Sequence, residues 1–292
     1  MSIVRVQEVN RWDQAFSRQQ QDQLLDLLED GQVLLFENLR FALLGDEASL
    51  LTPSVSDGRS KNIAVDPVTG RVAGSSLTGP RLELLRRLVV RFSRQSRDLL
   101  DALFPSYAAK LQTRLASYRP VQVEGRVSSE RKDDTRLHVD AFASRPNQGR
   151  RILRVFSNIN PEDRPRTWLV GEPFERYAQR FLPKVRPQWP LEGTTLRVLG
   201  VTKSRRTAYD HLMLGLHDRG KLDRDYQRDS FHERFDFQPG STWICFTDQV
   251  LHAALGGHYM LEQTFMLPVE AMRNPDRSPL RTLERLTGRA LV

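Results

Sequence analysis

The sequence has 292 residues, of which 39% are hydrophobic, with a formal net charge of +8 and a pI near 10.0. No apolar run reaches the roughly 18 residues that a membrane-spanning helix needs, and Met1–Arg5 lacks the pattern of an export signal. The single cysteine, Cys245, excludes an internal disulfide, so we expect a cytoplasmic protein. From the length of the chain we expect one large domain over residues 1–292.

The first 119 residues are predicted to form a mostly helical part. Apolar residues recur there at helical spacing in two stretches, separated by a region rich in glycine, serine, aspartate and proline. Gly31 ends the first stretch, and Pro105 interrupts the second. The expected elements are a helix at 12–30, a strand at 32–36, loops at 45–80 and two helices within 80–117.

From residue 120 the pattern becomes one of strands. Pro120–Val127 alternates with a period of two, as a half-buried strand does. A run of strands over 120–270 favours a mainly β, α+β protein with a double-stranded β-helix core of the jelly-roll type, on which the N-terminal helices pack. The further expected strands are 151–157, 194–202, 241–247 and 262–269, and the expected helices between them are 173–182 and 206–219.

The C-terminal segment, residues 271–292, is basic and contains an amphipathic stretch that we expect to be helical. Its leucines either dock on the barrel or insert into an anionic membrane surface. Because the net charge is positive, we expect peripheral attachment to the inner face of the cytoplasmic membrane. The residues involved are Leu280, Leu283, Leu286 and Leu291, interspersed with Arg281, Arg285 and Arg289.

The tripeptide His138-Val139-Asp140 is the most informative motif of the sequence. In an extended strand, residues i and i+2 point to the same side, so this imidazole and this carboxylate can bind one metal ion. His252, which follows an apolar strand far downstream, can supply a second imidazole. Two histidines and one carboxylate on one face of Fe(II) leave the other positions open for a co-substrate and dioxygen. We therefore predict an iron site formed by these three side chains.

Other histidines are weaker candidates for the third ligand. His258 is the rival of His252, but the preceding Gly256-Gly257 is expected to turn it away. His211 and His217 are six residues apart and therefore do not share a helical face. The alternative to a metal site is that the histidines of the motif are ordinary polar residues.

Iron sites of this type usually take 2-oxoglutarate, whose remote carboxylate needs a cation or hydroxyls in a buried pocket. The stretch Leu261–Phe265 after the distal histidine contains no cation. Arg154 lies in an apolar strand after Asp140, where it must face a cavity or a buried partner. We predict that Arg154 binds this carboxylate, and pairing with a structural acid is the alternative. The helpers or rivals are Gln263, Thr264 and Arg126.

Longer segments around the motif are more specific than the motif itself. Leu137–Pro146 and Gly149–Pro161 resemble the Kdo hydroxylases, and Trp243–Gly257 is similar to theirs as well. Kdo is 3-deoxy-D-manno-oct-2-ulosonic acid, the acidic sugar that links lipid A to the rest of lipopolysaccharide. The resemblance is strongest over 120–270 and extends along most of the chain.

The resemblance implies an Fe(II)/2-oxoglutarate/O₂-dependent dioxygenase that hydroxylates carbon 3 of Kdo, giving D-glycero-D-talo-oct-2-ulosonic acid, succinate and CO₂. His138, Asp140 and His252 match the iron ligands of the family residue by residue. The implied partner is Kdo-containing lipopolysaccharide or its precursor, whose carboxylate and phosphates suit an arginine-rich chain. The candidate contacts to these anions are Arg145, Arg150, Arg151, Arg205 and Arg206.

Two other functions fit parts of the sequence. The first is a non-catalytic β-barrel that binds a polyanion. No strand interleaves aromatic and basic residues as single-strand binders do, so we expect no nucleic acid partner. The second is a related oxygenase with a protein or a small molecule as its substrate. Stoichiometric iron and consumption of 2-oxoglutarate distinguish any oxygenase from a binding module.

Overall fold

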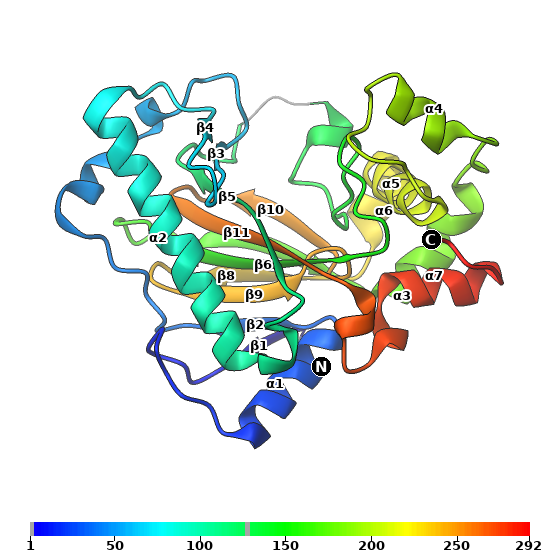
Figure 1. The fold of residues 1–292 in the computed structure, drawn as a ribbon, viewed down its shortest axis with the longest axis horizontal. Helices are drawn as coiled ribbons and strands as arrows, with labels where there is room; N and C mark the ends of the chain where they lie inside the picture. The colour runs from blue at the N-terminus through cyan, green and yellow to red at the C-terminus, as the bar shows by residue number, and fades with distance from the viewer. Residues whose placement is uncertain (1–2, 126–128) are drawn as a thin grey trace.

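The computed structural model describes residues 3–125 and 129–292, whose strands form two sheets (Figure 1). The larger sheet has the order β1-β2-β9-β6-β11-β5-β3-β4, and the smaller has the order β10-β7-β8. The strands are β1 (Val4–Val6), β2 (Val33–Phe36), β3 (Ile63–Val65), β4 (Val72–Ala73), β5 (Gln112–Arg119), β6 (Arg151–Asn158), β7 (Arg166–Gly171), β8 (His232–Phe237), β9 (Thr242–Phe246), β10 (His252–Gly256) and β11 (Met260–Leu267).

The N-terminal helices cover the outer face of the larger sheet, as predicted (Figure 1). Leu88 and Phe92 of the long helix α2 belong to the same apolar cluster as Leu153 of β6 and Phe265 of β11. The helices are α1 (Arg18–Glu29), α2 (Gly79–Leu103), α3 (Phe174–Phe181), α4 (Glu192–Val198), α5 (Ala208–Leu222), α6 (Arg224–Asp229) and α7 (Pro279–Thr287).

A second apolar cluster lies between the two sheets. Phe156 of β6 stacks on Trp243 of β9 at 5.3 Å between ring centroids, and Trp168 of β7 meets Trp243 edge-on at 5.6 Å. Trp243 faces this cluster, whereas its neighbour Ile244 faces the helices. Because both faces of β9 are covered, its sequence is a continuous apolar run. The sandwich of two sheets with outer helices agrees with the predicted α+β class and β-helix core.

The segment that contains His138 extends the smaller sheet. His138 and His252 form an antiparallel bridge in which each backbone N–H donates to the other's carbonyl oxygen, at 3.1 and 2.9 Å. Leu137 and Val139 are fully buried on one side of this extended segment. Since side chains alternate along a strand, His138 and Asp140 therefore project from its other side.

Three predicted elements are wrong. Residues 112–117, expected in a helix, belong to β5, and Pro120–Val127, expected in a strand, follows the end of β5; the last two residues of that range lie outside the described part. β5 was missed because Leu115 is exposed and much of the rest of the strand is polar, which hides the alternation. Residues 194–202, expected in a strand, belong to α4 and its exit. Their β-branched side chains favour a strand only where a sheet covers them, and here all of these except Thr202 are exposed.

The C-terminal leucines dock on the protein. Leu280, Leu283 and Leu291 of the segment around α7 are almost completely buried, and Arg285 pairs with Glu175 of α3 at 3.0 Å. Of the two alternatives for this segment, insertion into a membrane is therefore wrong, because the side chains that it requires are inside the molecule. None of the helices in the described part of the chain combines the length and the apolar character needed to cross a bilayer.

We predict that Leu283→Ala lowers the free energy of unfolding by about 2–5 kcal/mol, because it leaves a cavity under α7. Arg289→Ala, at an exposed position of the same segment, should change it by no more than about 0.5 kcal/mol. Denaturant titration followed by circular dichroism measures both. Equal stability of the two variants would contradict docking of the leucines.

Candidate metal centre

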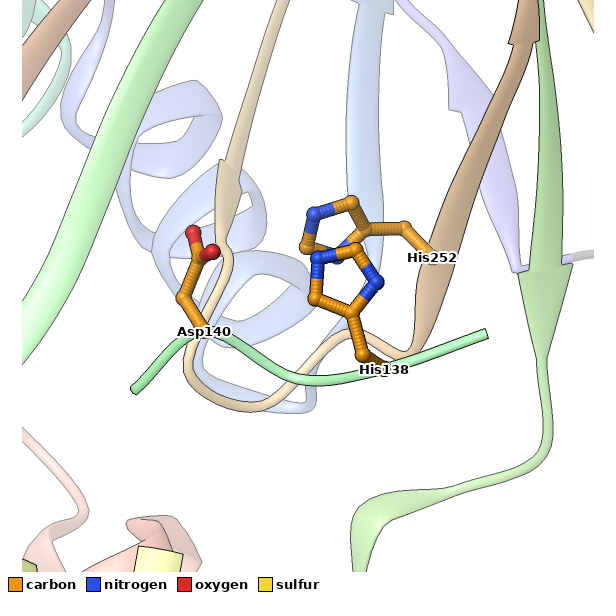
Figure 2. Close-up of side chains that lie close together, drawn as sticks. All are labelled: His138, Asp140 and His252. Atoms are coloured by element: carbon orange, nitrogen blue, oxygen red, sulfur yellow. The ribbon is translucent and has the colours of Figure 1, made fainter. Parts of the chain in front are cut away.

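The three predicted ligands lie together at one end of the space between the sheets, and the carboxylate of Asp140 faces the rings of His138 and His252 (Figure 2). One ligand atom of each residue lies within 4.8 Å of those of the other two, and the two rings are 4.7 Å apart. Among residues 3–125 and 129–292, no other group of histidine, cysteine and acidic side chains converges in this way. The bridge between the segment of His138 and β10 is what unites the three.

Hydrogen bonds fix the tautomer of both histidines. Nδ1 of His138 lies 2.7 Å from the carbonyl oxygen of Arg136, and Nδ1 of His252 lies 2.9 Å from that of Val250. A carbonyl oxygen only accepts, so each Nδ1 carries the proton and each Nε2 keeps a lone pair for a metal. Burial lowers the pKa of both rings, so both are neutral at pH 7.

Asp140 provides the negative charge of the site. Burial raises the pKa of its carboxyl group, but the Arg154 guanidinium, 3.1 Å away, and further neighbours lower it to about 2. The carboxylate is therefore ionised at neutral pH. Two neutral imidazoles and one carboxylate on one side of a point are the donor set that binds Fe(II) with open positions, so these residues fit a single iron ion.

The other histidines near the site do not join this group. Nδ1 of His258 lies 2.6 Å from Oε1 of Gln122, after a turn in which Gly257 has a φ of +97°. A Cβ at Gly257 would stand 2.8 Å from the carbonyl oxygen of Pro165, so both conformation and space require glycine there. His217 packs edge-on against the ring of His138 at 5.3 Å, which its sequence context did not indicate.

The triad forms part of the wall of a cavity of about 1160 Å³. Most small-molecule pockets measure roughly 300–1,000 Å³, so this one has room for a co-substrate together with a bulky substrate. Phe156, Trp168 and Met260 line it with apolar surface, and the Trp168 ring stacks on His252 at 5.1 Å. This apolar side restricts water around the metal ligands.

A row of alternating charges lines another part of the cavity and ends at the metal site. Arg154 lies between two carboxylates, since it is 3.1 Å from Asp140 and 2.8 Å from Glu262. The row continues from Glu262 to Arg119, then over 3.9 Å to Asp134, which pairs with Lys61. We call these six residues the ionic row. Three cations face three anions in it, so the row carries no net charge.

Arg166 of β7 lines the same cavity but is not part of this balanced row. Its side chain is buried and donates from Nη1 to the carbonyl oxygen of Gly257 at 2.7 Å, while its Nε has no hydrogen-bond partner. No carboxylate of the described residues lies within ion-pair distance of it. Burial lowers the pKa of Arg166 to about 9, which still leaves it charged at neutral pH. A buried cation without an acid is a strong site for an anionic ligand.

Of the residues predicted to help bind 2-oxoglutarate, only one is found in the wall of the cavity among the described residues. Thr264 of β11 lines the cavity. Gln263 does not, because it lies on the other face of β11, where its Nε2 donates to the carbonyl oxygen of Arg114 at 2.9 Å. Arg126 lies outside the described residues.

Some of the predicted substrate contacts line the cavity, and others do not. Arg145 and Arg150 line the cavity. Arg151 is fully buried on the other face of β6, paired with Asp248 at 2.8 Å, so its prediction as a substrate contact is wrong. Arg205 and Arg206 are not among the lining residues, and Arg206 donates to the carbonyl oxygen of Ala143 at 2.6 Å.

Several cations that the sequence analysis did not single out also line the cavity. They come from strands, loops and helices far apart in the chain, so no local pattern marks them. Lys221 of α5 is buried there, and burial lowers its pKa to about 8. The others, besides Arg119 and Arg166, are Lys61, Arg114, Arg131, Lys132 and Lys203.

Non-haem iron oxygenases hold their metal in this way, from paired strands at the open end of a double-stranded β-helix, and the chain is of that class. The comparisons narrow the class. The family model of 3-deoxy-D-manno-oct-2-ulosonic acid (Kdo) hydroxylase matches residues 11–290. The chain therefore belongs to the Kdo hydroxylase family, as its motifs predicted. The comparison with curated protein sequences gave no match.

Solved structures of the Kdo hydroxylase KdoO, a non-haem Fe(II), α-ketoglutarate-dependent dioxygenase, are similar along the whole chain. The complex with α-ketoglutarate and Fe(III) is 45% identical, covers 99% of this chain and 97% of its own, and superposes with a TM-score of 0.95. The complex with cobalt(II) is 46% identical, covers 100% and 98%, and gives a TM-score of 0.97.

We predict that His138→Ala, Asp140→Ala and His252→Ala each lose stoichiometric Fe(II) and reduce turnover by more than about 100-fold, because each removes one of three protein ligands. His258→Ala is the matched control and should retain iron and most activity. Metal analysis after anaerobic loading, together with turnover, measures this. Loss of iron in His258→Ala with retention in His252→Ala would show that the ligand assignment is wrong.

Proposed function

We propose that this protein uses Fe(II), 2-oxoglutarate and O₂ to hydroxylate carbon 3 of Kdo carried by lipid A or by the inner core of lipopolysaccharide. The products are D-glycero-D-talo-oct-2-ulosonic acid, succinate and CO₂. The observation that carries the proposal is the iron-type triad in the wall of a cation-lined cavity, in a chain of the Kdo hydroxylase family. The KdoO complexes with Fe(III) and α-ketoglutarate or succinate support the same cofactor and co-substrate here.

When bound, iron together with 2-oxoglutarate and O₂ supplies an oxidant strong enough to remove hydrogen from an unactivated CH₂ group. The chain contributes the orientation. The carbonyl oxygens of Arg136 and Val250 hold both imidazoles in the ligating tautomer. Arg154 holds Asp140 ionised and in place. Trp168, stacked on His252, keeps that ring from rotating and limits access of water.

We propose Arg166 as the residue that binds the remote carboxylate of 2-oxoglutarate. It lies on the same face of β7 as Trp168, two residues away, which is about 7 Å along a strand. It is buried and lacks an acidic partner, so a carboxylate would satisfy both its charge and its free Nε. Arg154 was the residue predicted for this role, but Asp140 and Glu262 already balance its charge. Thr264 is the hydroxyl that remains available in the cavity.

We predict that Arg166→Met raises the KM for 2-oxoglutarate by an amount equivalent to roughly 2–4 kcal/mol while iron binding stays nearly intact. Arg154→Met should instead weaken iron binding, because Asp140 loses its arginine partner and stands beside Glu262, which keeps only Arg119. Uncoupled decarboxylation of 2-oxoglutarate and metal titration measure the two effects. The reverse result would restore Arg154 as the carboxylate ligand.

The substrate's own anions have a separate set of candidate partners. We propose that Arg145, Arg150 and Lys221 contact the Kdo carboxylate or the neighbouring lipid A phosphates, since all three line the cavity outside the ionic row. A lipid-linked sugar also implies that the enzyme works at the cytoplasmic face of the inner membrane, attached peripherally. The positive net charge of the chain supports this location.

The direct test is incubation of the pure protein with Fe(II), 2-oxoglutarate, O₂ and Kdo-terminated lipid A, followed by mass spectrometry. We expect one oxygen atom to be added to Kdo for each succinate formed, and no addition with His138→Ala. Consumption of 2-oxoglutarate with another acceptor, and none with any Kdo compound, would mean a related oxygenase with a different substrate.

A further inference from the structure

Exposed apolar side chains are concentrated in one short part of the surface. Among the large hydrophobic residues that are exposed in the described part of the chain, five lie between residues 189 and 201. We call residues 189–201 the α4 segment, and Figure 1 shows α4 at the outer edge of the molecule, beyond α5. The exposed fractions are 71% for Trp189, 78% for Leu191, 79% for Val198, 70% for Leu199 and 54% for Val201.

The backbone of Leu191 is strained. Its φ is +63°, in the left-handed region, where glycine or asparagine is much more favourable than leucine. Burial does not compensate this strain, because the side chain is exposed. Neither backbone preference nor packing within the chain accounts for a leucine at this position, so an interaction outside the chain is the remaining physical reason.

The α4 segment is held firmly against the rim of the cavity. Gly193 packs so closely on the following loop that a Cβ there would stand 2.1 Å from the carbonyl oxygen of Arg206. In that loop, the backbone N–H of Lys203 donates to the carbonyl oxygen of Ser144 at 2.9 Å, and both Lys203 and Ser204 line the cavity. The exposed apolar side chains are therefore fixed in position beside the entrance to the site.

The surroundings of the α4 segment are strongly cationic. Between residues 184 and 206 the only acidic residue is Glu192, which pairs with Arg186 at 2.8 Å. An exposed tryptophan and aliphatic side chains flanked by lysine and arginine are the composition of elements that bind at the headgroup level of anionic bilayers. The cations of this stretch are Lys184, Arg186, Arg197, Lys203, Arg205 and Arg206.

We propose that the α4 segment inserts its apolar side chains into the interfacial layer of an anionic lipid bilayer and so holds the cavity entrance against the membrane. The occupant of this surface is the bilayer itself, to which the cations beside α4 are complementary. That the membrane contains the substrate rests on the proposed function, whereas binding to the bilayer does not. The C-terminal helix, whose leucines are buried, has no part in it.

The test uses flotation of the full-length protein with vesicles of phosphatidylglycerol mixed with phosphatidylcholine, without any Kdo lipid. The double variant Leu191→Asn/Leu199→Ser should bind about tenfold more weakly than the wild type, because it removes two inserted side chains. Asparagine also accepts the left-handed backbone at 191, so the change should not impair folding. The control is Val6→Ser/Leu44→Ser, which removes two apolar side chains elsewhere that are 54% and 55% exposed and should bind like the wild type.

A second measurement, the fluorescence emission of tryptophan, reports whether Trp189 enters the bilayer. Trp168 and Trp243 are buried and Trp12 is partly buried, whereas Trp189 is exposed, so addition of anionic vesicles should shift the emission to the blue. The shift should disappear in Trp189→Phe. It should weaken in Arg197→Gln/Arg205→Gln, because the attraction to the anionic surface is reduced.

Three outcomes would overturn the proposal. These are no binding of the wild type to anionic vesicles, equal binding of the α4 double variant, and conversion of a dimer to a monomer by that variant with vesicle binding unchanged. The last would make the surface an interface between two copies. The mass-spectrometric assay tests the proposed function separately, because it can use a water-soluble Kdo glycoside without any vesicle. Flotation tests membrane binding without any Kdo, so the failure of one proposal can be told from the failure of the other.

Discussion

The backbone bridge between His138 and His252 is the contact on which the site depends. It joins a strand segment before β6 to the first residue of β10, and it sets the two imidazoles 4.7 Å apart. Buried Leu137 and Val139 fix which side of that segment faces the cavity. A shift by one residue would bury both ligands of the motif and expose two apolar side chains, so the hydrophobic core enforces the geometry of the metal site.

The ligand triad could be predicted because a short sequence motif determines the arrangement of two of its three side chains. Spacing of i and i+2 in a strand places His138 and Asp140 on one side whatever the rest of the fold does. The strands β6, β9 and β11 were also predictable, since their apolar runs need cover on both faces. By contrast, β5 faces a polar cavity and α4 is exposed, so neither shows the periodicity by which buried elements are found.

The roles of the arginines could not be read from the sequence. Arg151 and Arg166 are the first residues of β6 and β7, and Arg154 lies within β6, but none of their local patterns indicates a partner. What separates them is the acid that tertiary structure brings to each: Asp248 for Arg151, Asp140 and Glu262 for Arg154, and none within ion-pair distance in the described chain for Arg166. Such pairings depend on the register between strands distant in sequence, which no motif records.

The ionic row has a consequence for how the enzyme would respond to ionic strength. Its pairs near Asp140 are buried, and dissolved salt screens buried charges weakly, whereas it screens exposed charges over a Debye length of about 8 Å under physiological conditions. Lys203 at the cavity rim is exposed to such screening. Added salt should therefore slow the capture of an anionic substrate and leave the rate of the bound complex nearly unchanged. The protein thus separates electrostatic attraction, at the rim, from electrostatic positioning, at the metal.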